Sequence, residues 1–212
     1  MIKRTGAYTI AFESQPVIAG WGSVVGKKEA EGPLKNYFDK IIYDSYDGCD
    51  TFEQAESMFQ GEALEKALER SKTHANEVDC VFAGDLLNQC IGACSTMAQS
   101  LIMAASAVES GGAKVSACVT SSHFASAERQ YRFPLEYGGV RTPTAQWTVT
   151  GAGSCILKSL KKGICVARAT VGRIVDLGVS DANNMGAAMA PAAAQTLECY
   201  LEDTKTSPED YD

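Results

Sequence analysis

Histidine is scarce in this chain, which has only His74 and His123 among its 212 residues. The eight cysteines are scattered, and no two of them are separated by just two residues. A closed zinc site needs four Cys or His ligands, usually with pairs at that short spacing. The sequence therefore predicts no metal site, and it contains no motif that calls for a cofactor.

Phosphate and nucleic-acid binding signals are also missing. No glycine-rich loop of the form GxxxxGK[ST] is present, although Gly20, Gly22 and Gly26 lie close together. The formal net charge is −7, whereas a nucleic-acid interface requires a basic face. We therefore expect no nucleic-acid partner.

The N-terminus lacks the apolar stretch of a secretory signal, since no such stretch follows the basic residues in 1–6. We therefore expect a reducing compartment and free thiols. Residues 86–108 carry no charge and are long enough to suggest a membrane span. They also include several polar side chains and Gly92, so a buried helix in a soluble domain is the better interpretation.

The chain alternates between helix and strand patterns. Thr51 and Gln54 form a capping box for an amphipathic helix that ends near Lys72. A strand over 78–83 follows, then a helix that stops at Gly111, and then a strand over 115–120. With 45% hydrophobic residues, the chain can bury a core, and the alternation predicts a layered α/β sheet.

The ends of the chain are less regular. Residues 7–26 predict a strand, a break, a second strand and a glycine-rich turn. Residues 27–50 predict an excursion with weak local structure, either a subunit contact or a solvated loop.

Residues 151–171 predict a hairpin in which Gly151 to Gly153 bend the chain, 154–157 continue, and 164–171 form the returning strand. A helix is expected over 183–195 with Pro191 near its first turn, followed by a charged tail with no terminating element.

Cys94 occupies the position around which we expect the chain to be organised. Apolar residues at Met97, Leu101, Ala104 and Val108 recur at helical steps directly after it. A helix N-terminus stabilises an anion, so it can lower the pKa of a thiol or accept a ligand carboxylate. The alternative is a small buried thiol with no chemical role.

His123, Glu128, Arg129 and Arg132 form a second candidate group after the strand over 115–120. In open α/β sheets, ligands bind outside the carboxyl ends of the strands. A histidine can activate a cysteine, and arginines beside a helix end form an anion site. The alternatives are that His123 satisfies a buried carbonyl and that the arginines form surface ion pairs with Glu128.

Several longer stretches resemble the stage V sporulation protein AD family, within the thiolase-like superfamily. They follow one another in the family's order over nearly the whole chain: 28–34 (KEAEGPL), 83–89 (AGDLLNQ), 92–96 (GACST), 120–123 (TSSH), 127–134 (AERQYRFP), 136–139 (EYGG), 148–153 (TVTGAG) and 176–194.

The resemblance implies a thiolase-like, layered α/β/α fold, with residues 1–212 forming a single N-terminal half domain. Family members have a helix and a strand between the motifs that here end at Gln89 and begin at Gly92. They also continue past the position of Asp212 into a second thiolase-like half. We therefore expect a shortened version of the family's chain, with a deletion near residues 89–91 and with part of the pocket wall missing.

The resemblance also implies a function. Family members are similar to binding proteins for dipicolinic acid (pyridine-2,6-dicarboxylate), which serve its uptake into the developing spore. Membrane-embedded proteins of the same operon are the implied partners, at the spore inner membrane, and a homodimer is expected. The implied ligand-binding residues are Cys94, His123, Glu128, Arg129 and Arg132.

Two other functions stay open. In the wider superfamily the cysteine that matches Cys94 accepts an acyl group, so the chain could be an acyltransferase or condensing enzyme. The absence of any second histidine other than His74 favours binding over catalysis. The third reading is a structural module of a membrane complex whose inherited pocket is empty.

Overall fold

The computed structural model describes residues 1–85, 95–131, 148–181 and 184–211, with the side chains of 128–131 and Met185 left aside. The described residues form two compact units. One comprises residues 16–165, and the other comprises 1–15 together with 166–212.

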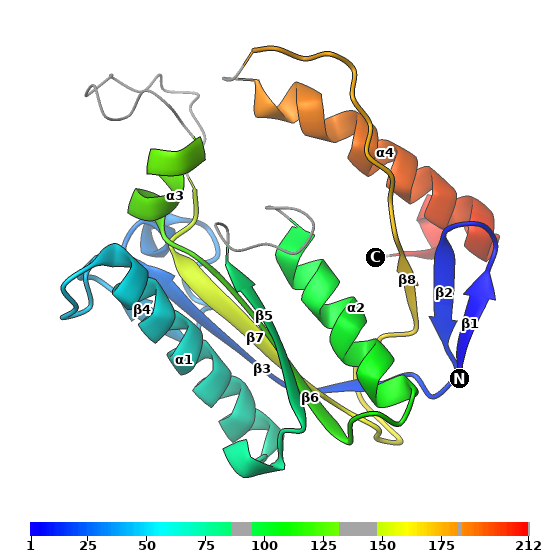
Figure 1. Ribbon diagram of the computed structural model, residues 1–212, viewed down its shortest axis with the longest axis horizontal. Coiled ribbons are helices and arrows are strands. Elements are labelled where there is room, and N and C mark those ends of the chain that lie inside the picture. Colours follow the sequence, from blue (N-terminus) through cyan, green and yellow to red (C-terminus); the bar gives the residue numbers. More distant parts are fainter. Residues whose placement is uncertain (86–94, 132–147, 182–183, 212) are drawn as a thin grey trace. The chain divides into compact units, whose positions relative to one another are not determined.

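The larger unit is built on a five-stranded sheet with the order β4-β3-β7-β6-β5. Its strands are β3 (Val17–Gly26), β4 (Lys40–Ile42), β5 (Cys80–Asp85), β6 (Val115–Ser122) and β7 (Gly151–Lys158). β5 and β6 are parallel, whereas β7 runs antiparallel to both of its neighbours, β3 and β6. Helix α1 (Phe52–Ser71) covers one face of this sheet, and α2 (Thr96–Glu109) packs on the other (Figure 1).

Helix α1 begins where the sequence predicts. The Thr51 hydroxyl oxygen accepts a hydrogen bond from the Gln54 N–H, and Gln54 Oε1 accepts one from the Thr51 N–H. The predicted capping box is therefore confirmed. The helix ends at Ser71, and the C-cap residue Lys72 adopts the left-handed conformation. Its buried stripe includes Phe59 and Ala63.

Two glycines let α1 approach the sheet closely. A Cβ on Gly22 would lie 2.1 Å from the carbonyl oxygen of Ala63, and one on Gly20 would lie 2.3 Å from that of Ala67. β3 therefore runs through both glycines as one strand with an irregularity between Ile18 and Gly20. The two strands and the break predicted within residues 7–26 are confirmed, since one strand ends at Phe12 and β3 begins at Val17. The predicted glycine-rich turn is wrong, because these glycines lie inside β3 and serve packing.

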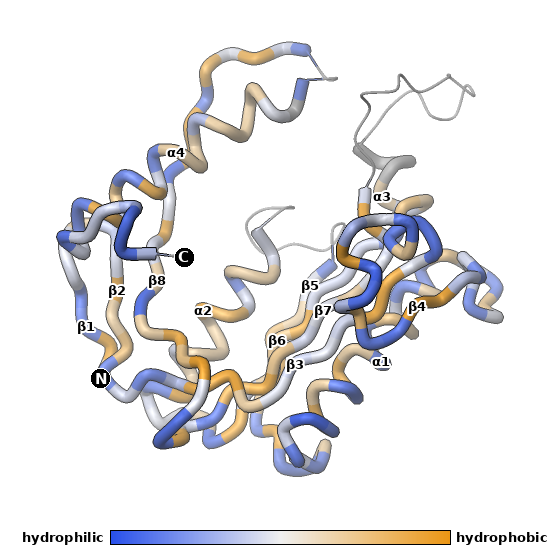
Figure 2. The backbone as a smooth tube through the Cα atoms, turned by 180° about the vertical axis from the view of Figure 1, so that it is seen from behind, coloured by the Kyte–Doolittle hydropathy of each residue, from blue (hydrophilic) through white to orange (hydrophobic). Residues whose placement is uncertain are grey.

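Helix α2 and the strands beside it follow the predicted pattern. Ala104, Ala105 and Val108 are buried, and Figure 2 shows hydrophobic positions along β3, β6 and β7. The predicted stop is confirmed, since Gly111 has φ +75° and its N–H donates to the Val108 carbonyl. The layered α/β arrangement expected for the chain is confirmed in this unit.

The segment after β6 departs from the prediction. Gly151 and Gly153 lie inside β7, so they do not bend the chain. The expected hairpin is wrong: Ile164 and Cys165 pair with the start of β3, and β8 (Arg168–Thr170) joins a different sheet. The local spacing was typical of a hairpin, but the true partners are more than a hundred residues away in the sequence.

The smaller unit has a three-stranded sheet, β1 (Ile2–Thr5), β2 (Thr9–Phe12) and β8, with helix α4 (Met185–Thr204) against it. The α4 residue Asp203 accepts the backbone N–H groups of Ala7, Tyr8 and Thr9 at 2.8 to 2.9 Å. Burial alone raises the pKa of Asp203, but these hydrogen bonds and nearby Arg4 hold it below its ordinary value. The ionised carboxylate therefore fastens α4 to the turn between β1 and β2.

Helix α4 is longer than predicted. It begins at Met185, where the Asn184 side chain accepts the Ala187 N–H, so Pro191 lies inside the helix and not in its first turn. It runs into the charged tail, which then forms a short 3-10 helix, η5 (Pro208–Asp210). The prediction followed the usual preference of proline for the first helical position, which this helix does not follow.

Candidate functional site

Three strands meet at the edge of the sheet where the predicted site belongs. β5 and β6 end there together, because Asp85 lies opposite Ser121, and β7 begins there, because Gly151 lies opposite Ser122. Segment 86–94 follows β5, and segment 132–147 lies between α3 (Phe124–Tyr131) and β7 in the sequence. The expectation that these two strands end side by side is confirmed for β5 and β6.

Most of the predicted ligand-binding residues cannot be placed at this edge. Cys94 and Arg132 lie outside the described residues, and for Glu128 and Arg129 only the backbone of α3 is described. The helix predicted to begin at Cys94 or just after it begins at Thr96, with Ser95 as its N-cap residue. His123 is the one candidate whose side chain is described.

His123 is a buried residue between β6 and α3, with 2% of its surface exposed. Its ring stacks on Phe52 at the start of α1, with 4.8 Å between ring centroids. Nε2 lies 2.9 Å from the Ser45 carbonyl oxygen, and the Ala125 N–H donates to Nδ1 at 3.2 Å. These partners require the neutral tautomer with its proton on Nε2.

Burial lowers the pKa of His123, although the Ser45 carbonyl and the charges of Glu53 and Glu29 oppose this. The alternative that His123 satisfies a buried carbonyl is therefore confirmed by the bond to Ser45. Both ring nitrogens are engaged within the protein, so a direct bond to a ligand would have to replace one of them. In the described geometry His123 fixes the start of α3, which leads to Glu128 and Arg129.

Glu56 is a buried carboxyl group that the sequence analysis missed. It lies on α1 and accepts hydrogen bonds from Ser121 Oγ at 2.7 Å and from Ser126 Oγ at 3.4 Å. The Gln60 amide donates to Ser121 Oγ at 2.6 Å. Burial raises the pKa of Glu56, and nearby Asp85 and Glu53 raise it further against the effect of the two serines. This carboxyl joins α1 to the end of β6 and to α3.

Glu29 holds the start of β7. Its Oε1 accepts the Thr150 N–H at 3.1 Å, and Thr150 Oγ1 in turn accepts the Phe124 N–H at 2.9 Å. Residues 27–50, for which we predicted weak local structure, therefore contribute a structural contact to this edge. The stretch 28–34, which includes Glu29 and resembles the family, could have indicated that this region has an ordered role.

The ionisable side chains named above at this edge are acidic apart from His123. Glu29, Glu56 and Asp85 all lie there, and His123 is neutral. A dianionic ligand would therefore need cationic partners, and the candidates are Arg129 and Arg132.

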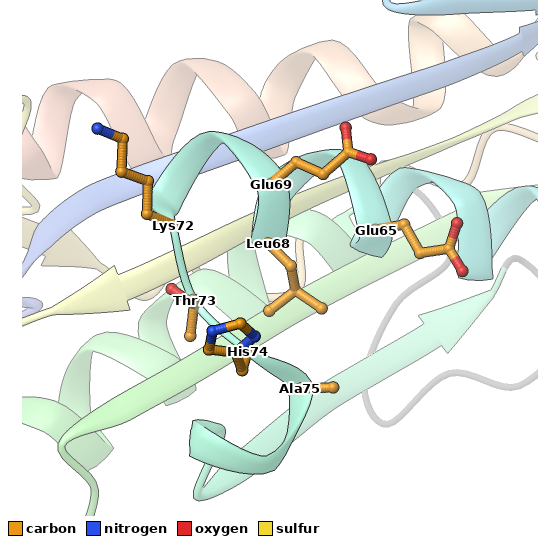
Figure 3. Close-up of a pocket in the computed structure, with 7 residues that line it drawn as sticks. All are labelled: Glu65, Leu68, Glu69, Lys72, Thr73, His74 and Ala75. Atoms are coloured by element: carbon orange, nitrogen blue, oxygen red, sulfur yellow. The ribbon is translucent and has the colours of Figure 1, made fainter.

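A groove of about 460 Å³ lies at the other end of α1 (Figure 3). Leu68, Thr73 and His74 line it together with Glu65, Glu69 and Lys72. Glu69 is paired with Lys66 at 2.8 Å, so the groove gathers charges of both signs. None of the predicted ligand-binding residues lines it, and it offers no concentration of positive charge for an anion.

The described ranges contain neither a metal-binding cluster nor a membrane-spanning helix. Within residues 1–85, 95–131, 148–181 and 184–211, no three His, Cys, Asp or Glu side chains are grouped so that they could hold a metal ion. In the same ranges, no helix has the length and apolar character needed to cross a membrane.

Comparisons of sequence give a consistent result. The family model for stage V sporulation protein AD matches residues 6–212. Stage V sporulation protein AD of Bacillus subtilis (strain 168) is 37% identical over an alignment of 228 positions, which covers 100% of this chain and 68% of that protein. The alignment has more positions than the 212 residues of the chain.

Comparisons of structure agree on the fold. The 3-oxoacyl-(acyl carrier protein) synthase III from Xanthomonas oryzae pv. oryzae has a TM-score of 0.58 at 13% identity, with 100% of this chain and 77% of that chain covered. The tetronic acid condensing enzyme AbyA1 has a TM-score of 0.54 at 16% identity, with 93% and 77% covered. The chain spans about half (51%) of a priming β-ketosynthase from the R1128 polyketide pathway.

These synthases share the thiolase-like fold with this chain. At 13% and 16% sequence identity, the similarity shows the fold alone. The match to the sporulation protein AD family is a match of sequence and not of fold alone. It runs through nearly the whole chain and includes the stretches that surround His123 and Glu29. The chain belongs to the stage V sporulation protein AD family.

Proposed function

We propose that this chain binds dipicolinic acid and serves its uptake into the developing spore. Membership of the family gives the chain a role in sporulation. The observation that carries the proposal is the family match over residues 6–212, which includes every candidate ligand-binding residue. Dipicolinate is a small aromatic dianion, so it suits a helix N-terminus combined with arginines.

The proposed pocket lies outside the carboxyl ends of β5 and β6. Cys94 contributes through its place directly before the α2 N-cap, and Arg129 and Arg132 supply the positive charge. Glu128 and His123 complete the set, with His123 acting by fixing the start of α3.

The proposed partners follow from the same role. Uptake into the spore requires passage across its inner membrane, so we propose peripheral association there with membrane-embedded proteins of the same operon. A homodimer is proposed as the state of the chain itself.

Replacing Arg129 and Arg132 by glutamine is expected to weaken dipicolinate binding at least tenfold. Each charge-assisted hydrogen bond to a carboxylate is worth about 1.5–3 kcal/mol, and about 1.4 kcal/mol corresponds to a factor of ten. Isothermal titration with dipicolinate measures the change, first for Arg129→Gln and Arg132→Gln separately and then for both.

Arg173→Gln is the matched control, because Arg173 lies over the Tyr8 ring in the other unit. Its affinity should equal that of the parent chain. Absence of dipicolinate binding by the parent chain and by its Bacillus subtilis relative would refute the proposal.

A second candidate function is acyl transfer through Cys94. The observation that favours it is the start of α2 at Thr96, two residues after Cys94, in a fold shared with the synthases. Incubation with acyl-CoA donors should then add an acyl mass to Cys94, and an unmodified Cys94 across a series of donors would exclude this function.

A further inference from the structure

We propose that Cys118 and Cys155 form a reversible dithiol–disulfide pair, which is an oxidation site within the sheet. Cys118 lies on β6 and Cys155 on β7, and the two residues are directly opposite each other in the antiparallel register. Both thiols are free in the structure.

The positions allow a bond with little movement of the backbone. Opposite residues in an antiparallel pair have Cα atoms about 4.5–5.5 Å apart, within the range of about 4.4–6.8 Å that disulfides span. The Cys118 sulfur lies 3.7 Å from the Cys155 carbonyl oxygen, so its side chain already points toward β7.

The pair lies beneath α2. Ala117 packs with Ala67 of α1, and successive strand residues point to opposite faces, so Cys118 points to the face that α2 covers (Figure 1). Cys118 is fully buried, whereas Cys155 is partly exposed. Cys155 is therefore the residue of the pair that is more accessible to a small oxidant, and Cys118 lies opposite it on β6.

The electrostatics assign a role to each sulfur. A hydrogen bond from the Cys118 thiol lowers the pKa of Cys155, against the effect of burial. The same contact with Cys155, together with burial, raises the pKa of Cys118. Cys155 is thus the attacking thiolate, and Cys118 is the resolving thiol.

Hydrogen peroxide oxidises the pair to a disulfide in two steps. The Cys155 thiolate attacks one peroxide oxygen and becomes a sulfenic acid, and the other oxygen leaves as hydroxide, which takes the proton that the thiol lost. The Cys118 sulfur then attacks the sulfenic sulfur, the S–O bond breaks, and the oxygen leaves as water with the Cys118 proton. Two thiols lose two electrons and two protons, and one peroxide becomes two water molecules.

Cys80 is the matched control. It lies on the neighbouring strand β5, where its sulfur is 3.3 Å from Ser116 Oγ. Cys80 is opposite Ser116 in the register and is only diagonal to Cys118. Such diagonal neighbours are about 7–8 Å apart, which is beyond the reach of a disulfide without backbone movement.

Peptide mapping tests the proposal on the folded chain. The reduced chain is treated with hydrogen peroxide, alkylated, and digested with trypsin. Cleavage after Lys and Arg gives the peptides 115–129 and 142–158, which hold Cys118 and Cys155 as their only cysteines. Mass spectrometry then looks for the two peptides joined by a disulfide that a dithiol reductant releases.

The expected result is a 115–129 peptide linked to 142–158 within one chain, with no disulfide-linked dimer on a denaturing, non-reducing gel, and it should be unchanged by Cys80→Ser. In Cys118→Ser the link should be lost, and Cys155 should be trapped as a sulfenic acid by dimedone. Unlinked peptides from the oxidised folded chain, or a link from either peptide to another cysteine, would overturn the proposal.

Discussion

Replacing Gly22 by alanine is expected to lower the free energy of unfolding by about 3 kcal/mol, the upper end of the usual cost of overpacking. The new Cβ would lie 2.1 Å from the carbonyl oxygen of Ala63. Both atoms are fixed by the backbones of β3 and α1, so no side-chain rotation can relieve the contact. Helix α1 would have to move away from β3, and it would take Phe59 out of the core with it. Urea unfolding followed by circular dichroism measures the loss.

Gly61 provides the control within the same helix. A Cβ at this position meets nothing within 4 Å, so Gly61→Ala should raise the free energy of unfolding by about 1 kcal/mol through helix propensity alone. If Gly22→Ala were as stable as the parent chain, the close approach of α1 to β3 would be wrong.

The second large effect concerns Glu56. Glu56→Leu removes the acceptor of the Ser121 hydroxyl and should cost about 1–3 kcal/mol, because a buried polar group loses its partner. Glu56→Gln keeps an acceptor oxygen and removes a charge from a buried position. Glu56→Gln should therefore be at least as stable as the parent chain at neutral pH.

The dependence on pH separates these effects. The pKa of Glu56 is raised in the folded chain, so the folded state binds this proton more tightly than the unfolded state does. Its stabilising effect is complete below the unfolded pKa of about 4.3 and is lost as the pH rises through the folded value. The free energy of unfolding of Glu56→Gln, relative to that of the parent chain, should thus increase between pH 4.5 and pH 7.5. The increase should be larger the further the folded pKa of Glu56 lies above the unfolded value. Urea unfolding at both pH values measures the difference, and a difference independent of pH would contradict the buried carboxyl.

Local signals in the sequence were sufficient for much of the larger unit. The capping box at Thr51 and the stop at Gly111 depend on residues a few positions apart, and both were predicted correctly. The partner of β8 was not predicted. Thr170 pairs with Thr9, and the local sequence around either residue does not indicate a partner so far away in the chain. Gly22 was assigned to a turn region for the same reason, since its neighbour in space is Ala63.

The candidate site shows the same division. The position of His123 after a strand was readable from the sequence, whereas its bond to the Ser45 carbonyl joins residues far apart in the chain. Glu56 looked like one of the charges of an amphipathic helix, and only the packing of α1 against β6 shows that it is buried. The family resemblance supplied the function that local patterns did not.

Alkylation of Cys94 in the presence and absence of dipicolinate tests the proposed binding most directly, because it reports both the ligand and its place. Dipicolinate is expected to slow the reaction of Cys94 with iodoacetamide, measured by mass spectrometry. It should leave the rate at the exposed Cys165 unchanged. An unchanged rate at Cys94 with saturating dipicolinate, or an equal slowing at both cysteines, would contradict a dipicolinate pocket at this helix start.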